Sequence, residues 1–361
     1  VSSVLASLPR QATRLRWEEA SVDLESANLA VVSALRDYAA ALGDASREPA
    51  VEAVVTRTTE LAASLERITL CGDDEGARTV ETTGRSFTLG LLPFDISARF
   101  QSMMQARPAA WIFTSATLSV PSSAGDDFSH FASRLGLQDA RSLRIASPFD
   151  YETQAMLYLP TGIPEPSSSG YVEAVIEASV PLLEASGGGA FILFTSHRAL
   201  SQGAALLRAR WDGAAEVPIL VQGEGPRERL LRDFREHGNA VLLGTASFWE
   251  GVDVKGEALR LVIIEKLPFA SPDDPLTKAR IEYLQRRGEN AFRDYQLPEA
   301  VLALKQGVGR LIRSETDQGM IVICDPRLLG KGYGRVFRAS LPEMPATQSR
   351  EDALRFLRKL R

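Results

Sequence analysis

The chain has 361 residues, 45% of them hydrophobic, so it is long enough to bury a full core and to form two or three domains. Its formal net charge of −5 argues against a uniformly basic surface, and no run of eighteen apolar residues is present to form a transmembrane helix. Only two cysteines, Cys71 and Cys324, are present, which argues against a disulfide framework or a structural zinc site.

The first part of the chain, residues 15–70, is expected to be helical. Its apolar residues recur at three- and four-residue spacing, without the alternation that is typical of a strand. These positions include Leu24, Ala27, Leu29, Val31, Val32, Leu35 and Tyr38. A turn-rich connection is expected from Cys71 to Gly84, because glycine and aspartate cluster there.

Two strands and one helix are predicted next. The strands are Ser86–Leu92 and Trp111–Thr114, and the helix is Ile96–Gln105. Asp95 directly precedes this helix and is expected to cap it. A polar connector, Ser119–Asp127, follows.

Strands and helices then alternate almost to the C-terminus. The predicted strands are Ala155–Leu159, Ala190–Phe194, Ile219–Val221, Ala240–Gly244, Leu259–Ile264 and Gly319–Cys324. The predicted helices are Tyr171–Glu184, Ala199–Trp211, Arg227–His237, Pro275–Arg287 and Pro298–Arg313. This alternation predicts an α/β fold with a parallel sheet covered by helices on both faces. Such sheets bind ligands at the carboxyl ends of their strands, where Thr195–His197 and Thr245–Ser247 fall.

The octapeptide at residues 306–313, Gln-Gly-Val-Gly-Arg-Leu-Ile-Arg, is the most informative motif. Arg310 and Arg313 are three residues apart, so within the predicted helix they project from nearly the same face. Two guanidinium groups beside Gly307 and Gly309, which allow another surface to approach closely, suit a polyanion such as a triphosphate. For the motif taken alone, a surface helix with solvated arginines is the alternative.

Three upstream segments accompany the octapeptide: Thr114–Leu118 (Thr-Ser-Ala-Thr-Leu), Phe191–Arg198 and Val241–Asp253. In this order and spacing the four segments resemble motifs III, IV, V and VI of superfamily 2 helicases. The Glu-Gly-x-Asp core followed by Gln-x-x-Gly-Arg-x-x-Arg most closely resembles the XPD/DinG branch of ATP-dependent DNA helicases. The resemblance covers the chain from Arg85 to the C-terminus.

Two motifs of that branch are absent from the sequence. There is no Gly-x-x-x-x-Gly-Lys-[Ser/Thr] loop, since Gly330-Lys331 is followed by Gly332 and position 325 is aspartate. There is also no Asp-Glu-x-His or Asp-Glu-Ala-Asp box for magnesium. The branch carries both motifs in its first RecA-like domain, and the chain opens with Val1. We therefore expect the C-terminal half of a longer helicase, whose other half holds most of the contacts to ATP and Mg²⁺.

The resemblance also implies a division into three parts. Residues 1–84 correspond to a helical arch-like segment, 85–119 to the end of the first RecA-like domain, and 120–361 to the second RecA-like domain. For the first part, a plain helical bundle packing on the motor is the alternative. Some members of the branch hold an iron–sulfur cluster on four cysteines, which two cysteines cannot do. We expect no metal site in this chain and expect both cysteines to fill apolar positions.

The resemblance assigns the chemistry to the octapeptide and to motif V. Arg310 and Arg313 would act as arginine fingers, because phosphoryl transfer is catalysed mainly by positive charge around the transferring group. Gln306 would orient the attacking water or bridge to the facing motif, with a solvent-exposed or capping amide as the alternative. The expected nucleotide contacts are Glu250, Gly251, Asp253 and Gly309. Gly251 would allow close approach, and Asp253 would bind the ribose or orient an arginine, or else form a turn or cap.

The expected DNA contacts follow the strands, and the expected coupling residues precede the connector. Hydroxyl groups suit DNA phosphates, and Trp249 would stack on a base or else fill the core. The DNA contacts are Thr195, Ser196, Arg198, Thr245, Ser247 and Trp249, and the coupling residues are Ser115 and Thr117. His197 is expected to be a polar group at a strand end or a DNA contact. Asp325 and Arg327 are expected to form a structural pair.

Charge distribution is compatible with a DNA partner. Residues 298–361 hold 12 Lys/Arg against 7 Asp/Glu, whereas residues 1–120 hold 11 against 15. The implied function is an ATP-dependent, 5′–3′ DNA helicase that acts on single-stranded DNA in the cytoplasm, of which this chain alone is inactive. The alternative is a non-catalytic RecA-like module that binds nucleic acid or a protein.

Overall fold

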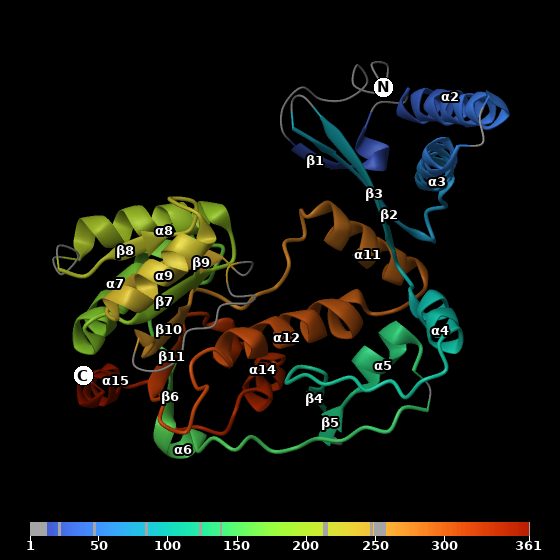
Figure 1. Cartoon of the computed structure of the whole chain (residues 1–361). Helices are drawn as coiled ribbons and strands as arrows, with labels where there is room; N and C mark the ends of the chain where they lie inside the picture. Colours follow the sequence, from blue (N-terminus) through green and yellow to red (C-terminus); the bar gives the residue numbers. More distant parts are fainter. Residues whose placement is uncertain are drawn as a thin grey trace. The chain divides into compact units, whose positions relative to one another are not determined.

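The computed structural model describes residues 13–20, 23–45, 48–83, 86–122, 125–137, 139–211, 216–245, 248 and 258–360. Their contacts define two compact units, whose elements are labelled in Figure 1. Unit 1 comprises Val1–Ala110, Ser133–Gln138 and Ala270–Tyr295, and unit 2 comprises Trp111–Ala132, Asp139–Phe269 and Gln296–Arg361. Each unit is therefore assembled from separate stretches of chain. The domain boundaries at residues 84 and 119 stay predictions.

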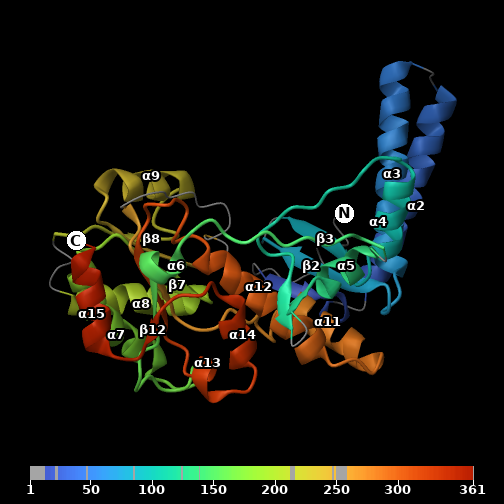
Figure 2. The same ribbon diagram turned by 90° about the horizontal axis from the view of Figure 1, so that it is seen from below.

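Unit 1 contains a pair of long helices, α2 (Leu24–Ala45) and α3 (Pro49–Leu70), which lie side by side in Figure 2. Pro49 occupies the first turn of α3, where its missing N–H costs no helical hydrogen bond. An ion pair of 2.6 Å between Arg36 and Glu66 joins the two helices. The helices predicted from residue spacing are confirmed.

A three-stranded antiparallel sheet accompanies these helices, and the sequence did not predict it. In this sheet β2 (Gly76–Thr82) pairs with both β1 (Thr13–Arg16) and β3 (Phe87–Pro93). The prediction of a turn-rich connection was wrong for β2, and the prediction of helix from residue 15 was wrong for β1. A 3₁₀ turn, η1 (Trp17–Glu19), follows β1.

Two further helices belong to unit 1, α4 (Ser97–Gln105) and α11 (Pro275–Arg286). The carboxylate of Asp95 accepts a 2.7 Å hydrogen bond from the Ser97 N–H at the start of α4, but the N-cap position of this helix is occupied by Ile96 and not, as predicted, by Asp95. Tyr283 of α11 stacks on Phe94 at a ring-centroid distance of 4.4 Å. The short π-helix η4 (Phe292–Gln296) follows α11 along the chain.

Unit 2 begins with residues that form no regular secondary structure. Trp111–Thr114 is assigned to neither helix nor strand, so the prediction of a strand there was wrong. Within the predicted connector, β4 (Val120–Ser122) pairs with β5 (Gly125–Asp127). The short helices α5 (Ser129–Leu135) and α6 (Tyr151–Gln154) come next along the chain.

The centre of unit 2 is a parallel sheet of seven strands, in the order β12-β6-β11-β10-β7-β9-β8, of which β12 is labelled in Figure 2 and the others in Figure 1. Every residue of β7, β9, β10 and β11 is buried, which is expected where helices cover both faces of a sheet. The predicted α/β fold is thus confirmed. The strands are β6 (Ala155–Tyr158), β7 (Ala190–Phe194), β8 (Ile219–Val221), β9 (Val241–Thr245), β10 (Leu261–Ile264), β11 (Gly319–Ile323) and β12 (Ala346–Thr347).

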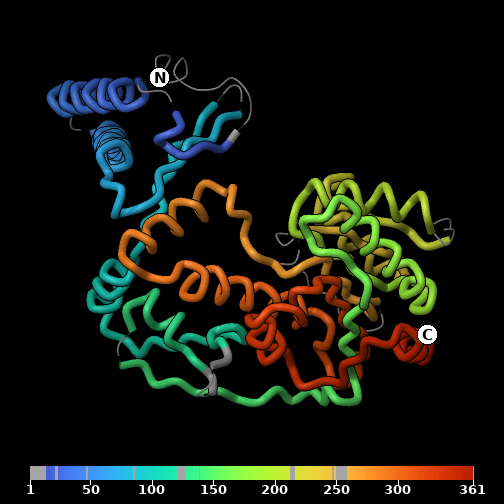
Figure 3. Tube along the Cα trace, turned by 180° about the vertical axis from the view of Figure 1, so that it is seen from behind, coloured from blue at the N-terminus to red at the C-terminus, as the bar shows by residue number. Residues whose placement is uncertain are grey.

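The sheet divides the core of unit 2 into two layers, and helices cover each of its faces. One face is covered by α7 (Tyr171–Ser186), α8 (His197–Arg210) and α15 (Arg350–Lys359). The other face is covered by α9 (Arg227–His237), α12 (Leu297–Val308), α13 (Arg327–Gly330) and α14 (Gly334–Ser340), of which α12 and α14 appear in orange and red in Figure 3. Gly203 lets α8 approach β7 closely, because a Cβ there would overlap the ring of Phe194.

No helix in the described parts of the chain is long and apolar enough to cross a membrane.

Candidate functional site

The candidate DNA-contacting residues Thr195 and Thr245 lie at the carboxyl ends of two neighbouring strands. Thr195 follows β7 directly, and Thr245 is the last residue of β9. These strands pair in parallel, with Phe194 opposite Thr245. The structure therefore brings the two threonines together at one edge of the sheet.

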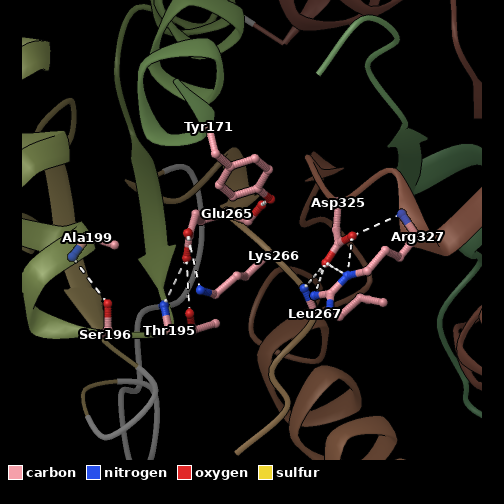
Figure 4. A network of polar contacts seen from close by, with 9 residues as sticks. All are labelled: Tyr171, Thr195, Ser196, Ala199, Glu265, Lys266, Leu267, Asp325 and Arg327. Atoms are coloured by element: carbon pink, nitrogen blue, oxygen red, sulfur yellow. Dashed lines mark hydrogen bonds and ion pairs between the residues drawn. The ribbon is translucent and has the colours of Figure 1, made fainter. Parts of the chain in front are cut away.

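Each threonine donates hydrogen bonds to a side-chain oxygen of a residue that follows an adjacent strand. For Thr195 this strand is β10, and for Thr245 it is β8. Oε2 of Glu265, which follows β10, accepts hydrogen bonds from the Thr195 N–H (3.1 Å) and hydroxyl (3.2 Å), as Figure 4 shows. Oε1 of Gln222, which follows β8, accepts from the Thr245 N–H (2.7 Å) and hydroxyl (3.1 Å). Sequence reasoning missed both acceptors, although each is a polar residue directly after a predicted strand.

Glu265 is almost completely buried, with 1% of its surface exposed. Burial raises the pKa of its carboxyl group, while the Lys266 ammonium at 3.9 Å and the hydrogen bonds from Thr195 act in the opposite direction. The Tyr171 hydroxyl donates a 2.5 Å hydrogen bond to the Glu265 backbone carbonyl. The end of β10 is thus fixed by both main-chain and side-chain contacts.

Asp325 and Arg327 form the predicted structural pair. The Asp325 carboxylate accepts hydrogen bonds from the Arg327 guanidinium at 2.6 and 2.9 Å, and from the Leu267 N–H at 2.9 Å (Figure 4). Because Leu267 follows β10 and Asp325 follows β11, this carboxylate ties together the carboxyl ends of two adjacent strands. The positive charge of Arg327 is thus paired with the Asp325 carboxylate, and the pair stabilises these two strand ends.

Exposed polar residues follow Thr195 at the start of α8. Ser196 is the N-cap of this helix, and its hydroxyl oxygen accepts from the Ala199 N–H at 3.2 Å. Ser196, His197 and Arg198 are all exposed. The first N–H groups of a helix have no partner within the helix and attract anions, so this helix start beside Arg198 suits a phosphate group.

The two arginines of the octapeptide lie in a turn, and the prediction that they share one helical face was wrong. The helix α12 ends at Val308, after which the Arg310 N–H bonds to Gly307 at 3.2 Å and the Leu311 N–H to Val308 at 3.1 Å. Two glycines weaken the helix at this point. Burial of Leu311 and its neighbour Ile312 in the core then draws the chain toward the sheet.

A buried carboxylate, Asp317, holds this turn. Its Oδ2 accepts hydrogen bonds from the N–H groups of Arg313 (2.8 Å) and Ser314 (2.9 Å), and its Oδ1 accepts from the Ser314 hydroxyl (2.7 Å). The Gln154 amide donates to the carbonyls of Ser314 and Asp317 at 3.0 and 2.8 Å. Since Gln154 directly precedes β6, the turn lies at the amino-terminal edge of the sheet, opposite Thr195 and Thr245.

The helix α12 also contacts the segment that follows Thr-Ser-Ala-Thr-Leu. Lys305 donates a 2.9 Å hydrogen bond to the Ser119 carbonyl, and Glu299 lies 3.3 Å from the His130 ring nitrogen. Gln306, next to Lys305, is exposed. Ser115 is exposed and Thr117 is half-buried, and their hydroxyl oxygens lie 3.1 Å apart.

Several predicted residues fall outside the described part of the chain: Ser247, Trp249, Glu250, Gly251 and Asp253. Gly309 is exposed, directly after α12. Cys71 and Cys324 are both buried thiols, and burial raises the pKa of each. Among the described residues, no three or more His, Cys, Asp or Glu side chains group as a candidate metal site.

Comparison with known proteins identifies the class of this fold. Residues 179–344 match the family described as helicase C-terminal domain. The backbone resembles a solved XPD helicase with a TM-score of 0.58 over 96% of this chain and 60% of that one, at 13% identity. It also resembles Xpd4 of S. tokodaii, with a TM-score of 0.51 over 82% and 58% of the two chains, at 15% identity. The seven-stranded sheet therefore has a RecA-like fold.

Sequence relatives narrow the class. The chain is 45% identical over 311 residues to the ATP-dependent DNA helicase YoaA of Escherichia coli, covering 86% of this chain and 48% of that protein. It is 34% identical over 309 residues to the 3′-5′ exonuclease DinG of Bacillus subtilis, covering 81% and 32%. The chain spans less than half the length of these relatives. The chain is thus similar to proteins named as YoaA, DinG and XPD helicases.

Proposed function

We propose that the chain is part of an ATP-dependent DNA helicase and that unit 2 is its second motor domain. The observation that carries this proposal is the arrangement of two polyanion-binding features at opposite edges of one parallel sheet. The start of α8 and the strand-end residues suit a DNA backbone, and the turn with Arg310 and Arg313 suits a triphosphate. The relatives named as ATP-dependent DNA helicases support the same function.

At the nucleotide edge, Arg310 and Arg313 act as arginine fingers on ATP that is held, together with Mg²⁺, mainly by the rest of the protein. Gln306 orients the attacking water or bridges to the facing motif. The sequence supports this division of labour, because it contains no phosphate-binding loop and no magnesium box. Glu250, Gly251, Asp253 and Gly309 complete the nucleotide contacts in this proposal.

At the DNA edge, single-stranded DNA lies across the carboxyl ends of β7 and β9. Ser196, Arg198 and the α8 amides bind phosphates, and Ser247 and Trp249 add a hydroxyl and a stacking ring. Contacts of this kind hold DNA without reading its sequence. The segment with Ser115 and Thr117 couples nucleotide state to DNA binding through its contact with α12, and translocation runs 5′ to 3′.

The DNA edge is tested by binding of a fluorescent single-stranded oligonucleotide to the 361-residue chain. Arg198→Ala should weaken binding about fivefold to tenfold and lower the slope of log affinity against log salt by about one, because one phosphate contact is lost. Arg355→Ala is the matched control, since Arg355 is an exposed arginine paired with Glu351 and Asp352 inside α15. Equal affinities for all three proteins would remove the DNA assignment.

The nucleotide edge is tested in the longer protein. Arg310→Ala and Arg313→Ala should each lower DNA-stimulated ATP turnover by a factor on the order of 10³ or more while sparing most DNA binding. Arg229→Ala, at an exposed arginine of α9, should leave turnover unchanged. Wild-type turnover in both octapeptide variants would contradict the arginine-finger assignment. If the longer protein bound DNA without hydrolysing ATP, the non-catalytic RecA-like module would be the better description.

A further inference from the structure

Thr195 and Thr245 are held by the same arrangement of hydrogen bonds. In each case one side-chain oxygen accepts from both the N–H and the hydroxyl of the threonine. Each acceptor, Glu265 or Gln222, stands at the end of the strand beside the one that carries the threonine. The order of these four strands is β10-β7-β9-β8, so the two arrangements lie next to each other along the sheet edge.

This geometry fixes both the backbone and the side chain of each threonine. The N–H bond orients the peptide unit at the strand end, and the hydroxyl bond selects one χ1 rotamer. Thr195 is 70 residues from Glu265 along the chain, and Thr245 is 23 residues from Gln222. These bonds therefore join separate strands, unlike the local cap in which Asp274 accepts from the N–H and hydroxyl of Thr277.

The engaged hydroxyls also change what the threonines offer to DNA. A threonine hydroxyl has a single proton, and each of these two donates it to Glu265 or Gln222. A phosphate oxygen needs a donor, so neither hydroxyl serves it in this arrangement. Donors remain one or more residues further along, in the Ser196 hydroxyl, the Arg198 guanidinium and the first amides of α8.

We propose that Glu265 and Gln222 are positioning residues for DNA binding, which fix Thr195 and Thr245 at adjacent strand ends and thereby aim the start of α8, which follows Thr195, at the DNA backbone. The proposal rests on the proposed DNA edge of unit 2. In it the threonines act as internal anchors, and phosphate contacts come from Ser196, Arg198 and the first amides of α8. The two positioning acceptors keep the adjacent strand ends, and with them the start of α8, in one conformation.

The test compares variants that remove the acceptor with one that preserves it. Glu265→Leu and Gln222→Leu should each weaken binding of a fluorescent oligothymidine to the 361-residue chain about tenfold, because two partly buried donors lose their partner. Glu265→Gln should restore binding to within about threefold of wild type, since the amide oxygen is the acceptor that the chain already uses at Gln222. If the leucine variants bound DNA weakly only because they are less stable, their unfolding temperature would fall and Glu265→Gln would not restore DNA binding.

Removing the hydroxyl donor provides a second route if the leucine variants fold poorly. Thr195→Val should weaken DNA binding, whereas Thr277→Val, which removes the corresponding hydroxyl donor from a helix cap, should not. If Thr195 acts only through Glu265, the double variant Thr195→Val/Glu265→Leu should bind no more weakly than Glu265→Leu. If Thr195 contacts DNA itself, the two losses should add, which would contradict the proposal.

Amide hydrogen exchange separates this proposal from the function on which it rests. The amides of Thr195 and Thr245 should exchange faster in the leucine variants than in wild type, whether or not DNA is present. Wild-type DNA binding with unchanged affinity in both leucine variants overturns the positioning role and leaves the proposed function standing. A wild-type chain that binds no single-stranded DNA overturns the DNA edge itself.

Discussion

Three buried carboxylates of unit 2, those of Glu265, Asp317 and Asp325, have different structural roles because they have different hydrogen-bond partners. Asp325 faces a guanidinium and ties two strand ends together, whereas Glu265 faces a hydroxyl, an N–H and a more distant ammonium. Asp317 accepts hydrogen bonds from the N–H groups of Arg313 and Ser314 and from the Ser314 hydroxyl. The sequence shows three similar acids after or before apolar runs, and only the folded chain distinguishes them.

Glu265 should make stability depend on pH in a definite direction. Burial raises the pKa of its carboxyl group above the usual value near 4.5, so between those two values the folded chain binds more protons than the unfolded chain. The contribution of Glu265 to the free energy of unfolding is therefore fully present below pH 4.5 and falls as pH rises through the folded-state pKa. Urea unfolding of wild type and Glu265→Gln across pH 4.5–8 measures this.

As pH rises, the free energy of unfolding of Glu265→Gln should increase relative to that of wild type. An opposite slope would mean that the Lys266 ammonium and the Thr195 donors outweigh burial and lower the pKa.

Asp317 should be needed both for stability and for turnover. Asp317→Ala leaves the N–H groups of Arg313 and Ser314 without their acceptor, which should cost about 2–3 kcal/mol in the free energy of unfolding. Because these bonds hold Arg313 in its turn, ATP turnover of the longer protein should also fall. Glu351→Ala, at a carboxylate whose side chain is 87% exposed, should change neither quantity appreciably.

At the scale of elements, the sequence predicts the parallel sheet well. The predicted bounds of β7, β8 and α9 agree with the structure to the residue. Strands buried on both faces read as continuous apolar runs, and turn residues bound them, so local sequence is sufficient. The strand-end position of Thr195 and Thr245 follows from the same pattern.

Elements whose stability depends on distant partners could not be predicted in this way. The strand β1 has only four residues, two of them arginine. It forms because it pairs with β2, where Arg16 lies opposite Thr79, a residue more than sixty positions further along the chain. The apolar run Trp111–Thr114 has strand composition but no partner strand among the described residues. The end of α12 depends on the burial of Leu311 and Ile312, which residue spacing does not reveal.

Two glycines in helices should respond in opposite ways to alanine. Gly203→Ala should destabilise the chain by about 1–3 kcal/mol, because the added methyl group would overlap the Phe194 ring and push α8 away from β7. Gly43→Ala should stabilise the chain by about 0.5–1 kcal/mol, since Gly43 lies within α2 with no atom in reach of a Cβ. Urea unfolding measures both.

Displacement of α8 by Gly203→Ala should also weaken DNA binding, since α8 carries Ser196 and Arg198 at its start. If Gly203→Ala lost stability but kept full affinity for DNA, the position of α8 would not matter for DNA binding.

At the scale of the whole molecule, the chain should hydrolyse no ATP by itself. Its sequence contains no phosphate-binding loop, and in the described residues no acidic cluster is formed that would hold magnesium. Phosphate release from the purified 361-residue chain should stay at background with and without single-stranded DNA. DNA-stimulated hydrolysis by the chain would contradict this expectation and require a nucleotide site that the present assignment does not contain.

The position of β6 in the sheet has a consequence for synthesis on the ribosome. This strand pairs only with β11 and β12 in the described sheet, through Ala155 with Gly319 and Leu157 with Ala346. At about 5–20 residues per second, roughly 10–30 seconds pass between the emergence of β6 and that of its first partner. An apolar strand must therefore wait unpaired while the middle of the sheet assembles, and chains that stop before β11 leave it open to chaperones or to aggregation.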